Sequence, residues 1–336
     1  MRRYLLLGFV TLSFAHAQEP LADYQPGGAM HGVIRVLGNY HMGTLLKYWE
    51  EGFRKYHPDI RFEEKLLGTA NAIAGLYLET ADIALMGREI LPIESIAYRR
   101  VFRADPVEIA VATASYNVPL ETFAFAIFVH RDNPIGRISL GQLRTVFGCS
   151  ARQNGCLART WGDLGLTGTW ANRPIHPYGY ETNTGLGYFF EQKVLGGGHL
   201  WNCNLHEYAN QYAADGKLLA NAGDLMIRDV GDDPEGIAFC GFGHKTDRVK
   251  ALAVATTESG PFVELTKPNV VNRTYPLTRT VYMFTNSADK SPVSRNVREF
   301  LRYVLSLEGQ RSVERQEIYL PLTADESSRQ LKRLLN

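Results

Sequence analysis

The sequence lacks the features by which membrane, metal-binding and nucleic-acid-binding proteins are usually recognised. Beyond its first residues it has no apolar run approaching the roughly 18 to 20 residues of a membrane helix. The formal net charge is only +1, without the basic excess of a nucleic-acid-binding domain. Four cysteines are present, and no two of them have the CxxC spacing of a zinc site. We therefore expect no nucleic-acid partner, no metal and no other cofactor.

The signatures of common enzyme classes are also missing. The chain has no HExxH, GxSxG or P-loop pattern, and its nine histidines are scattered without the spacing of metal ligands. Hydrolysis of a phosphate ester would need a nucleophile or a metal, and no residue stands out for that role. We expect a protein that is not an enzyme, and keep a phosphate-ester hydrolase as an alternative.

The first residues have the pattern of a secretory signal peptide. Arg2 and Arg3 precede an apolar stretch over residues 4–14, which closes with Ala-His-Ala at 15–17. This apolar core is too short to span a bilayer. No cysteine lies at the expected cleavage point, so the signature of a lipid-anchored bacterial protein is missing. We expect residues 1–17 to be a signal peptide and the mature chain to be soluble, exported and not lipid-anchored.

An exported chain with an even number of cysteines is expected to form disulfides. Cys149 and Cys156 would close a short loop of polar residues and glycine, which makes this pair sterically plausible. Cys203 with Cys240 then follows by elimination. We predict these two disulfides.

Predicted strands and helices alternate along the chain. A first strand at 33–37 leads into a helix with Leu45, Trp49 and Phe53 at helical spacing. Further strands are predicted at 60–66, 82–86, 107–114, 123–130, 174–178, 236–242 and 281–285, with helices starting near Gly68, Ser139, Gly185 and Ser291. This alternation predicts an open α/β fold with parallel sheets, whose ligands bind at the carboxyl ends of strands. Roughly 320 mature residues exceed the usual size of a single core, so we expect two lobes.

Small polar residues occupy the turns between some of these strands and helices. They are Asn39, Tyr40 and His41 in one turn, Thr69 in a second, and Thr182, Asn183 and Thr184 in a third. A helix start offers unpaired N–H groups and a partial positive charge, and so favours anions. Arg88 follows the third strand and could hold two oxygens of a tetrahedral anion in a fork. The alternatives are ordinary helix caps, and an Arg88 paired with Glu89 or Glu94.

Six segments in order resemble the phosphate-binding proteins of bacterial ABC uptake systems, which are members of the periplasmic substrate-binding protein superfamily. The resemblance covers nearly the whole mature chain. The segments are LGTANAIAGLYLETADIALMGREI, VHRDNPIGRISLGQLRTVFG, PYGYETNTGLGYFF, EGIAFCGFGH, NRTYPLTRTVYMF and VREFLRYVLSLEGQRSVERQEIYLPL.

The resemblance implies a periplasmic protein with a type II-like, two-lobe α/β fold. The first lobe would hold residues 30–120 and 270–336, and the second lobe residues 121–269, with crossings near 122–128 and 261–271. The two lobes would close about this hinge over inorganic phosphate or a similar oxyanion, and the closed protein would deliver it to a membrane ABC permease. The resemblance also implies a monomer. An exported oxyanion sensor, or an orphan binding protein without a transport role, remains an alternative.

The expected ligand-binding residues follow the family pattern only in part. Asn39, Tyr40, His41 and Thr69 match its first two turns, and Thr182, Asn183 and Thr184 match its polar third turn. The third strand ends in Gly87-Arg88 where the family has a serine, and Tyr180 stands where it has an arginine. A charged hydrogen bond is worth roughly 1.5 to 3 kcal/mol, so a site that lost this arginine would bind less tightly. Tyr180 could donate one neutral hydrogen bond instead.

Overall fold

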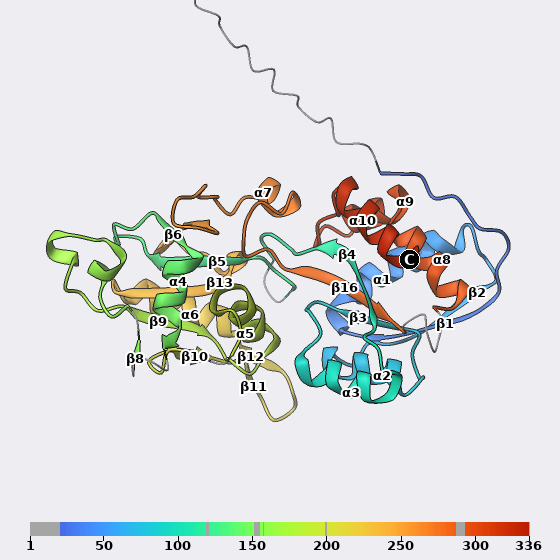
Figure 1. The fold of residues 1–336 in the computed structure, drawn as a ribbon, viewed down its shortest axis with the longest axis horizontal. Coiled ribbons are helices and arrows are strands. Elements are labelled where there is room, and N and C mark those ends of the chain that lie inside the picture. The colour runs from blue at the N-terminus through green and yellow to red at the C-terminus, as the bar shows by residue number, and fades with distance from the viewer. Residues whose placement is uncertain are drawn as a thin grey trace, which may run out of the picture.

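The chain forms two α/β lobes that lie side by side (Figure 1). The computed structural model describes residues 21–118, 121–150, 155–156, 158–198, 200–286 and 293–335. The described residues form one five-stranded sheet in each lobe. The predicted two-lobe α/β fold is therefore confirmed. The predicted signal peptide and the predicted helix start at Ser291 lie outside the described residues.

The sheet of the first lobe joins the two ends of the chain. Its strand order is β2-β1-β3-β16-β4, and β16 runs antiparallel to both of its neighbours. Strand β16 comes from late in the sequence, so this lobe closes only after the chain has passed through the second lobe. The strands are β1 (Gly32–Gly38), β2 (Ile60–Lys65), β3 (Ile83–Met86), β4 (Val107–Thr113) and β16 (Thr280–Thr285).

Helices cover both faces of this first sheet, as the alternation of side chains in β3 shows. Ile83 and Leu85 pack in one core cluster, whereas Ala84 and Met86 pack in another on the opposite face. Residues of α1, α8, α9 and α10 join the first cluster, and residues of α2 and α3 join the second. The helices are α1 (Gly43–Arg54), α2 (Ala72–Tyr77), α3 (Pro92–Phe102), α8 (Arg295–Val304), α9 (Leu307–Arg315) and α10 (Ala324–Leu335).

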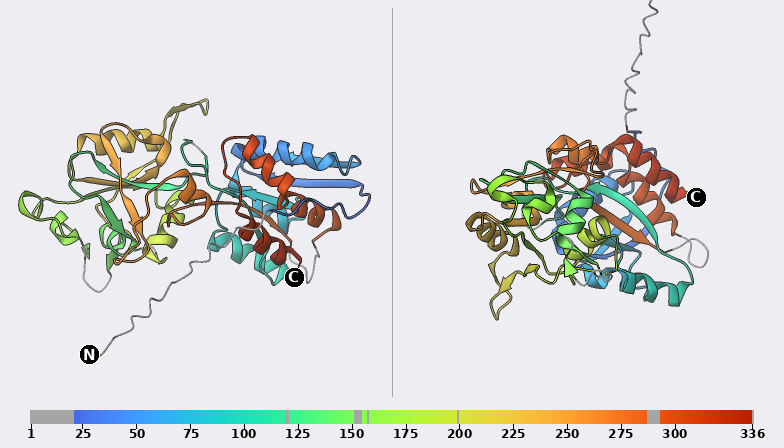
Figure 2. Two further views of the ribbon diagram at one scale, coloured as in Figure 1. Left: turned by 90° about the horizontal axis from the view of Figure 1, so that it is seen from above. Right: turned by 60° about the vertical axis from the view of Figure 1, so that its left-hand side comes forward.

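The second lobe repeats this plan with the middle of the chain (Figure 2). Its sheet order is β10-β9-β13-β5-β14, and β5 runs antiparallel to β13. The strands are β5 (Phe125–His130), β9 (His176–Tyr180), β10 (His206–Tyr208), β13 (Gly236–Gly241) and β14 (Val249–Ala251). The helices are α4 (Leu140–Phe147), α5 (Gly185–Phe190), α6 (Ala222–Asp232) and α7 (Lys267–Val271). Three short strand pairs are β6 (Arg137–Ser139) with β15 (Ala253–Ala255), β7 (Cys149–Ser150) with β8 (Gly155–Cys156), and β11 (Gln211–Tyr212) with β12 (Leu218–Ala220).

Two chain segments cross between the lobes and run beside each other. The first leads from β4 to β5, and the second leads from α7 to β16. The amide of Ala114 donates to the carbonyl of Arg279 at 3.1 Å, and that of Phe125 donates to the carbonyl of Leu277 at 3.0 Å. Val270 and Leu277 pack in the core cluster that contains β5, β9 and β13. The lobe boundaries and the crossing near 261–271 expected from the sequence stay predictions.

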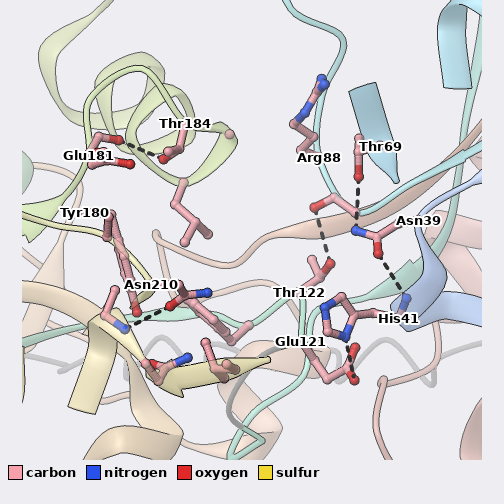
Figure 3. A pocket seen from close by; sticks show the side chains of 18 of the residues that line it. Asn39, His41, Thr69, Arg88, Glu121, Thr122, Tyr180, Glu181, Thr184 and Asn210 are labelled. Atoms are coloured by element: carbon pink, nitrogen blue, oxygen red, sulfur yellow. Dashed lines mark hydrogen bonds and ion pairs between the residues drawn. The ribbon is translucent and has the colours of Figure 1, made fainter. Parts of the chain in front are cut away.

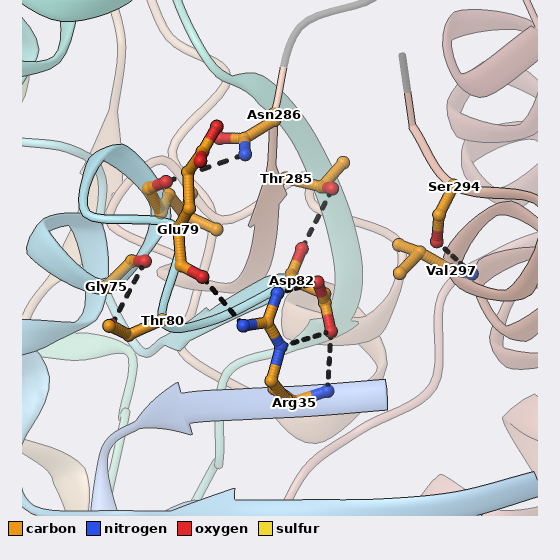
Figure 4. Close-up of polar contacts among 10 residues, drawn as sticks. Arg35, Gly75, Glu79, Thr80, Asp82, Thr285, Asn286, Ser294 and Val297 are labelled. Atoms are coloured by element: carbon orange, nitrogen blue, oxygen red, sulfur yellow. Dashed lines mark hydrogen bonds and ion pairs between the residues drawn. The ribbon is translucent and has the colours of Figure 1, made fainter. Parts of the chain in front are cut away.

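Asp82, which directly precedes β3, is tied to the neighbouring strands by polar contacts (Figure 4). Asp82 accepts hydrogen bonds from the Arg35 amide at 2.8 Å and from its guanidinium at 2.7 and 3.1 Å. The Thr285 hydroxyl donates to the carbonyl of Asp82 at 2.9 Å. These contacts connect β1, β3 and β16 and so fix the register of the sheet whose far end borders the other lobe.

The cysteine predictions have different outcomes. The predicted Cys203–Cys240 disulfide is wrong, because Cys203 is an exposed free thiol whereas Cys240 is a free thiol buried in β13. The sulfur of Cys240 lies 3.3 Å from the Tyr180 hydroxyl instead. Cys149 and Cys156 are directly opposite each other in the β7–β8 pair, which is compatible with a disulfide between them. The Cys149–Cys156 disulfide stays a prediction.

Among the described residues, no helix is both long enough and apolar enough to cross a membrane.

We predict that Glu50 in α1 makes the stability of the first lobe depend on pH. Its side chain is buried, and this burial raises its pKa to about 7 from 4.5. The folded state therefore holds a proton more tightly than the unfolded state, and the stabilisation present below pH 4.5 is lost as the pH rises to about 7. We expect Glu50→Gln to raise the free energy of unfolding by about 1 to 3 kcal/mol at pH 8. Urea denaturation at several pH values would measure this gain.

The gain should shrink toward pH 5, because there the wild-type carboxyl is already protonated. The exposed neighbour Glu51 provides the control, since Glu51→Gln should change stability little at any pH. A gain from Glu50→Gln that is equal at pH 5 and pH 8 would contradict this explanation.

Candidate ligand site between the lobes

A cleft of about 650 Å³ lies between the lobes and is lined by both of them (Figure 3). Seven of the nine residues predicted from the sequence line it: Asn39, Tyr40, His41, Thr69, Arg88, Tyr180 and Thr184. Residues of both crossing segments also line it. The cleft thus lies where movement of one lobe against the other would change its width.

The first lobe contributes two joined turns. The Asn39 side chain accepts a hydrogen bond from the His41 amide at 3.0 Å and donates one to the Thr69 hydroxyl at 3.0 Å. Figure 3 shows these three residues together on one wall of the cleft. Asn39 thereby caps the turn before α1 and fixes Thr69 of the next turn. Residues 30 positions apart are held as one polar surface.

The second lobe contributes the start of α5. Thr184 caps this helix, accepting from the Gly187 amide at 3.2 Å and donating to the carbonyl of Glu181 at 2.7 Å. Thr182 and Asn183 are not among the residues that line the cleft, and their role in ligand binding stays a prediction. They precede the cap on the outer part of the turn, where Asn183 is exposed and the Thr182 amide donates to Glu207 in β10 at 2.7 Å.

Tyr180 forms an apolar part of the wall rather than a free hydrogen-bond donor. Its ring stacks on Phe125, with the centroids 5.9 Å apart and the planes at 22°. Its hydroxyl lies 3.3 Å from the sulfur of Cys240, and burial raises the pKa of Tyr180. The residue therefore stays neutral, and its polar atom already has a partner.

Arg88 lines the cleft with its stem, but its guanidinium is bound to an acid. Its two terminal nitrogens donate to the two carboxylate oxygens of Glu94 at 2.8 and 2.6 Å. In Figure 3 the guanidinium points away from Asn39 and Thr122. The stem reaches the other lobe, since a Cβ on Gly185 would lie only 2.6 Å from the Arg88 Cδ. The sequence left two roles open for Arg88: holding an oxyanion, or pairing with Glu89 or Glu94. The structure shows the pair with Glu94.

The crossing segments contribute polar groups that the sequence analysis missed. They are Glu121 and Thr122 on the first crossing and Arg279 on the second. Glu121 accepts from the Tyr319 hydroxyl at 2.7 Å and lies 3.6 Å from the His41 ring nitrogen. The Thr122 hydroxyl donates to the carbonyl of Gly87 at 3.3 Å, and Arg279 donates to the same carbonyl at 3.0 Å.

Arg279 is a buried cation in this cleft. Its relative exposure is 5%, and burial lowers its pKa. No carboxylate lies within ion-pair distance of it in the part of the chain that the structure describes. One signal in the sequence was available: a single arginine directly precedes the apolar strand β16.

Comparisons with known proteins agree with this two-lobe arrangement. Residues 17–308 match the sequence model of the PBP superfamily domain. The chain belongs to the PBP superfamily. It is 30% identical to the phosphate-binding protein PstS of Pseudomonas aeruginosa, over 98% of this chain and 96% of that protein.

Solved structures at lower identity share the PBP superfamily fold. An ABC-type phosphate transport receptor from Vibrio cholerae superposes with a TM-score of 0.55 at 18% identity, covering 85% of this chain and 99% of that one. PstS from Borrelia burgdorferi superposes with a TM-score of 0.56 at 15% identity, covering 87% and 99% of the two chains. At these identities the likeness concerns the fold alone.

The second lobe adds further polar residues to the cleft of this PBP-superfamily chain. They include Asn210, Asn221 and His244, which lie on separate loops and turns. His244 is held by Asp224 at 2.7 Å, and its side chain is almost fully buried. Asn210 and Asn221 stand in stretches without a motif, and His244 closes the family-like segment EGIAFCGFGH but was not recognised there as a site residue.

We predict that a side chain at Gly87 would disrupt the hinge. A Cβ there would lie 2.0 Å from the Thr122 hydroxyl and 2.6 Å from the terminal carbon of Met42. Gly87→Ala should therefore lower the free energy of unfolding by about 1 to 3 kcal/mol. Urea denaturation of the variant would measure this loss.

The loss should be smaller when Thr122 is alanine, because the nearest clashing atom is then missing; a double-mutant cycle gives the coupling. Gly136→Ala is the control, since a Cβ there meets no atom within 4 Å. An equal cost of Gly87→Ala in both backgrounds would argue against the described contact.

Proposed function

We propose that this protein captures inorganic phosphate, or a similar tetrahedral oxyanion, between its lobes and delivers it to a membrane ABC permease. The observation that carries the proposal is a cleft lined by polar groups from both lobes and both crossing segments. The similarity to PstS of Pseudomonas aeruginosa over nearly the whole chain supports phosphate as the ligand. Among the residues predicted from the sequence, we assign the ligand contacts to Asn39, Tyr40, His41, Thr69 and Thr184, and to Tyr180 the role of an apolar wall.

Closure of the lobes would couple binding to transport. Phosphate first meets the groups of one lobe and then gains contacts with the other lobe as the cleft narrows. Because a ligand shifts an equilibrium only by its differential affinity, these additional contacts stabilise the closed form. The permease would distinguish the loaded protein by the relative position of its two lobes.

The proposed protein is a carrier and not an enzyme. Two of the hydroxyls that line the cleft already donate within the protein: Thr184 to the Glu181 carbonyl, and Thr122 to the Gly87 carbonyl. The His244 ring is bound to Asp224 at 2.7 Å, and among the described residues it makes no hydrogen bond to either hydroxyl. The groups are therefore arranged to hold a ligand rather than to activate a nucleophile.

The carrier is proposed to work as a periplasmic monomer after removal of residues 1–17. An oxidising compartment would permit a Cys149–Cys156 disulfide, for which the direct pairing in β7–β8 provides support. This cross-link would lie on the second lobe, away from the cleft-lining residues.

We predict that the purified protein binds phosphate at this cleft. Calorimetric titration with phosphate, arsenate, sulfate and molybdate should give heat with phosphate. Thr69→Val should weaken phosphate binding by roughly 2- to 10-fold, because one neutral hydrogen-bond partner is removed at nearly constant volume. The absence of heat with every oxyanion at millimolar concentration would refute the proposal.

Thr80→Val is a matched control for this substitution. Its hydroxyl bonds only the Gly75 carbonyl, at 3.4 Å, and it lies in the same lobe but outside the cleft. The Thr80→Val variant should bind phosphate with the same affinity as the wild-type protein. An unchanged affinity in Thr69→Val as well would remove Thr69 from the site.

We predict one disulfide in the exported protein. Tryptic mapping without reduction should yield two peptides joined through Cys149 and Cys156, since Arg152 lies between them. The exposed Cys203 should react with an alkylating reagent in the native protein, and the buried Cys240 only after unfolding. Free alkylation of Cys149 and Cys156 in protein isolated from the periplasm would contradict the pairing.

A further inference from the structure

Arg279 lines the cleft without a carboxylate in ion-pair distance among the residues that the structure describes. Arg279 donates one hydrogen bond, from a terminal nitrogen to the Gly87 carbonyl at 3.0 Å, and its Nε has no hydrogen-bond partner. Its guanidinium carbon lies 5.9, 5.8 and 5.5 Å from the ring centroids of Phe123, Phe125 and Phe189. The side chain is thus a desolvated cation with unused donors in the wall of a ligand cleft.

Such an arrangement is unfavourable unless something outside the chain balances it. Removing a charge from water costs several kcal/mol when no opposite charge is supplied, and interactions with aromatic rings offset only part of that cost. Buried charges in proteins are normally paired or bind a ligand. The lowered pKa of Arg279 has the same physical cause, since its first contribution is burial.

Arg88 also lines the cleft, but it has an acidic partner. Arg88 is similarly buried, but both of its terminal nitrogens are bound to Glu94. Glu94 in turn also accepts from the Leu91 amide at 2.8 Å at the start of α3. Releasing Arg88 would therefore leave a buried carboxylate without its main partner, whereas Arg279 can accept an anion without breaking any ion pair.

We propose that Arg279 is the cation that holds the oxyanion in this cleft. The assignment rests on the proposed function and adds to it a residue outside the turns that the sequence identified. It also accounts for Tyr180, which stands where the family resemblance implies an arginine. Tyr180 and Arg279 lie against the same two rings, Phe123 and Phe125, so the second crossing brings a guanidinium to the part of the cleft that Tyr180 borders.

The test is a set of arginine variants titrated with phosphate. Arg279→Met keeps most of the stem and should weaken binding roughly 100-fold, because a charged donor is lost. Arg279→Lys keeps the charge without the planar fork and should weaken binding about 10-fold. Arg88→Met should cause a smaller loss than either. If Arg88→Met is the more damaging variant, or Arg279→Met binds like the wild type, the assignment is wrong.

A matched control separates ligand binding from structural damage. Arg273 is a partly buried arginine near the second crossing, but it pairs with Glu326 at 3.2 Å and lies outside the cleft. Arg273→Met should lower the melting temperature of the phosphate-free protein and leave the phosphate affinity unchanged. Arg279→Met should weaken phosphate binding and leave the melting temperature of the phosphate-free protein nearly unchanged, because loss of the hydrogen bond to the Gly87 carbonyl is offset by removal of an unpaired buried charge. A lower melting temperature with wild-type affinity in Arg279→Met would establish a structural role instead.

Two further results complete the test. If the Arg279 variants do not fold, a crystal structure of the wild-type protein with phosphate decides: phosphate oxygens within hydrogen-bond distance of the Arg279 guanidinium support the assignment, and an anion held by Arg88 overturns it. If the wild-type protein binds no phosphate, the proposed function itself fails. Loss of the assignment with phosphate binding intact would leave the proposed function standing.

Discussion

The carbonyl oxygen of Gly87 is the point at which the two crossing segments and the first lobe are joined. Thr122 donates to it from the first crossing, and Arg279 donates to it from the second. A residue with a side chain at position 87 would displace the Thr122 hydroxyl, so this junction requires glycine. The cleft depends on it because the same three residues form part of its lining. Any rotation of the lobes must therefore take place around a fixed set of polar contacts.

The placement of charge in the hinge explains how a neutral protein can hold an anion. The lobes present mainly hydroxyls and amides, from Asn39 and Thr69 on one side and Thr184 on the other. These groups are neutral donors that cost little to expose when the cleft is open. The buried cation instead lies on a crossing segment, where aromatic rings keep water from it. An anion that enters the cleft then meets the charge in a medium of low dielectric constant, where attraction is strongest.

Much of the fold was predictable from the sequence because burial leaves a periodic pattern. The alternation of strands and helices located β1 to β5, β9, β13 and β16. The parallel sheets that it implied are wrong in part, because β16 runs antiparallel to β3 and β4, and β5 runs antiparallel to β13 and β14. Helices α3 and α6 were not predicted from the sequence. In α3, Ile93 and Val101 are exposed, so the apolar residues of this helix do not all lie on its buried face. The Cys203–Cys240 pairing failed for a related reason: counting cysteines does not reveal that β13 buries one of them.

The candidate site was predictable only where residues follow one another in a turn. Arg279 is 192 positions from Gly87, and only the folded chain brings them together.

Tyr180 stands where the family resemblance implies an arginine, and this difference is linked to the presence of the cation Arg279 in the same part of the cleft. A guanidinium at position 180 would have to be buried against Phe125 and Cys240, where Tyr180 now packs its ring and satisfies its hydroxyl. With Arg279 already beside the same rings, a second arginine there would place two like charges together without water between them. A neutral aromatic residue removes that repulsion and adds apolar contact to the wall. Among the described residues of the site, the positive charge without an acidic partner therefore lies on the second crossing segment.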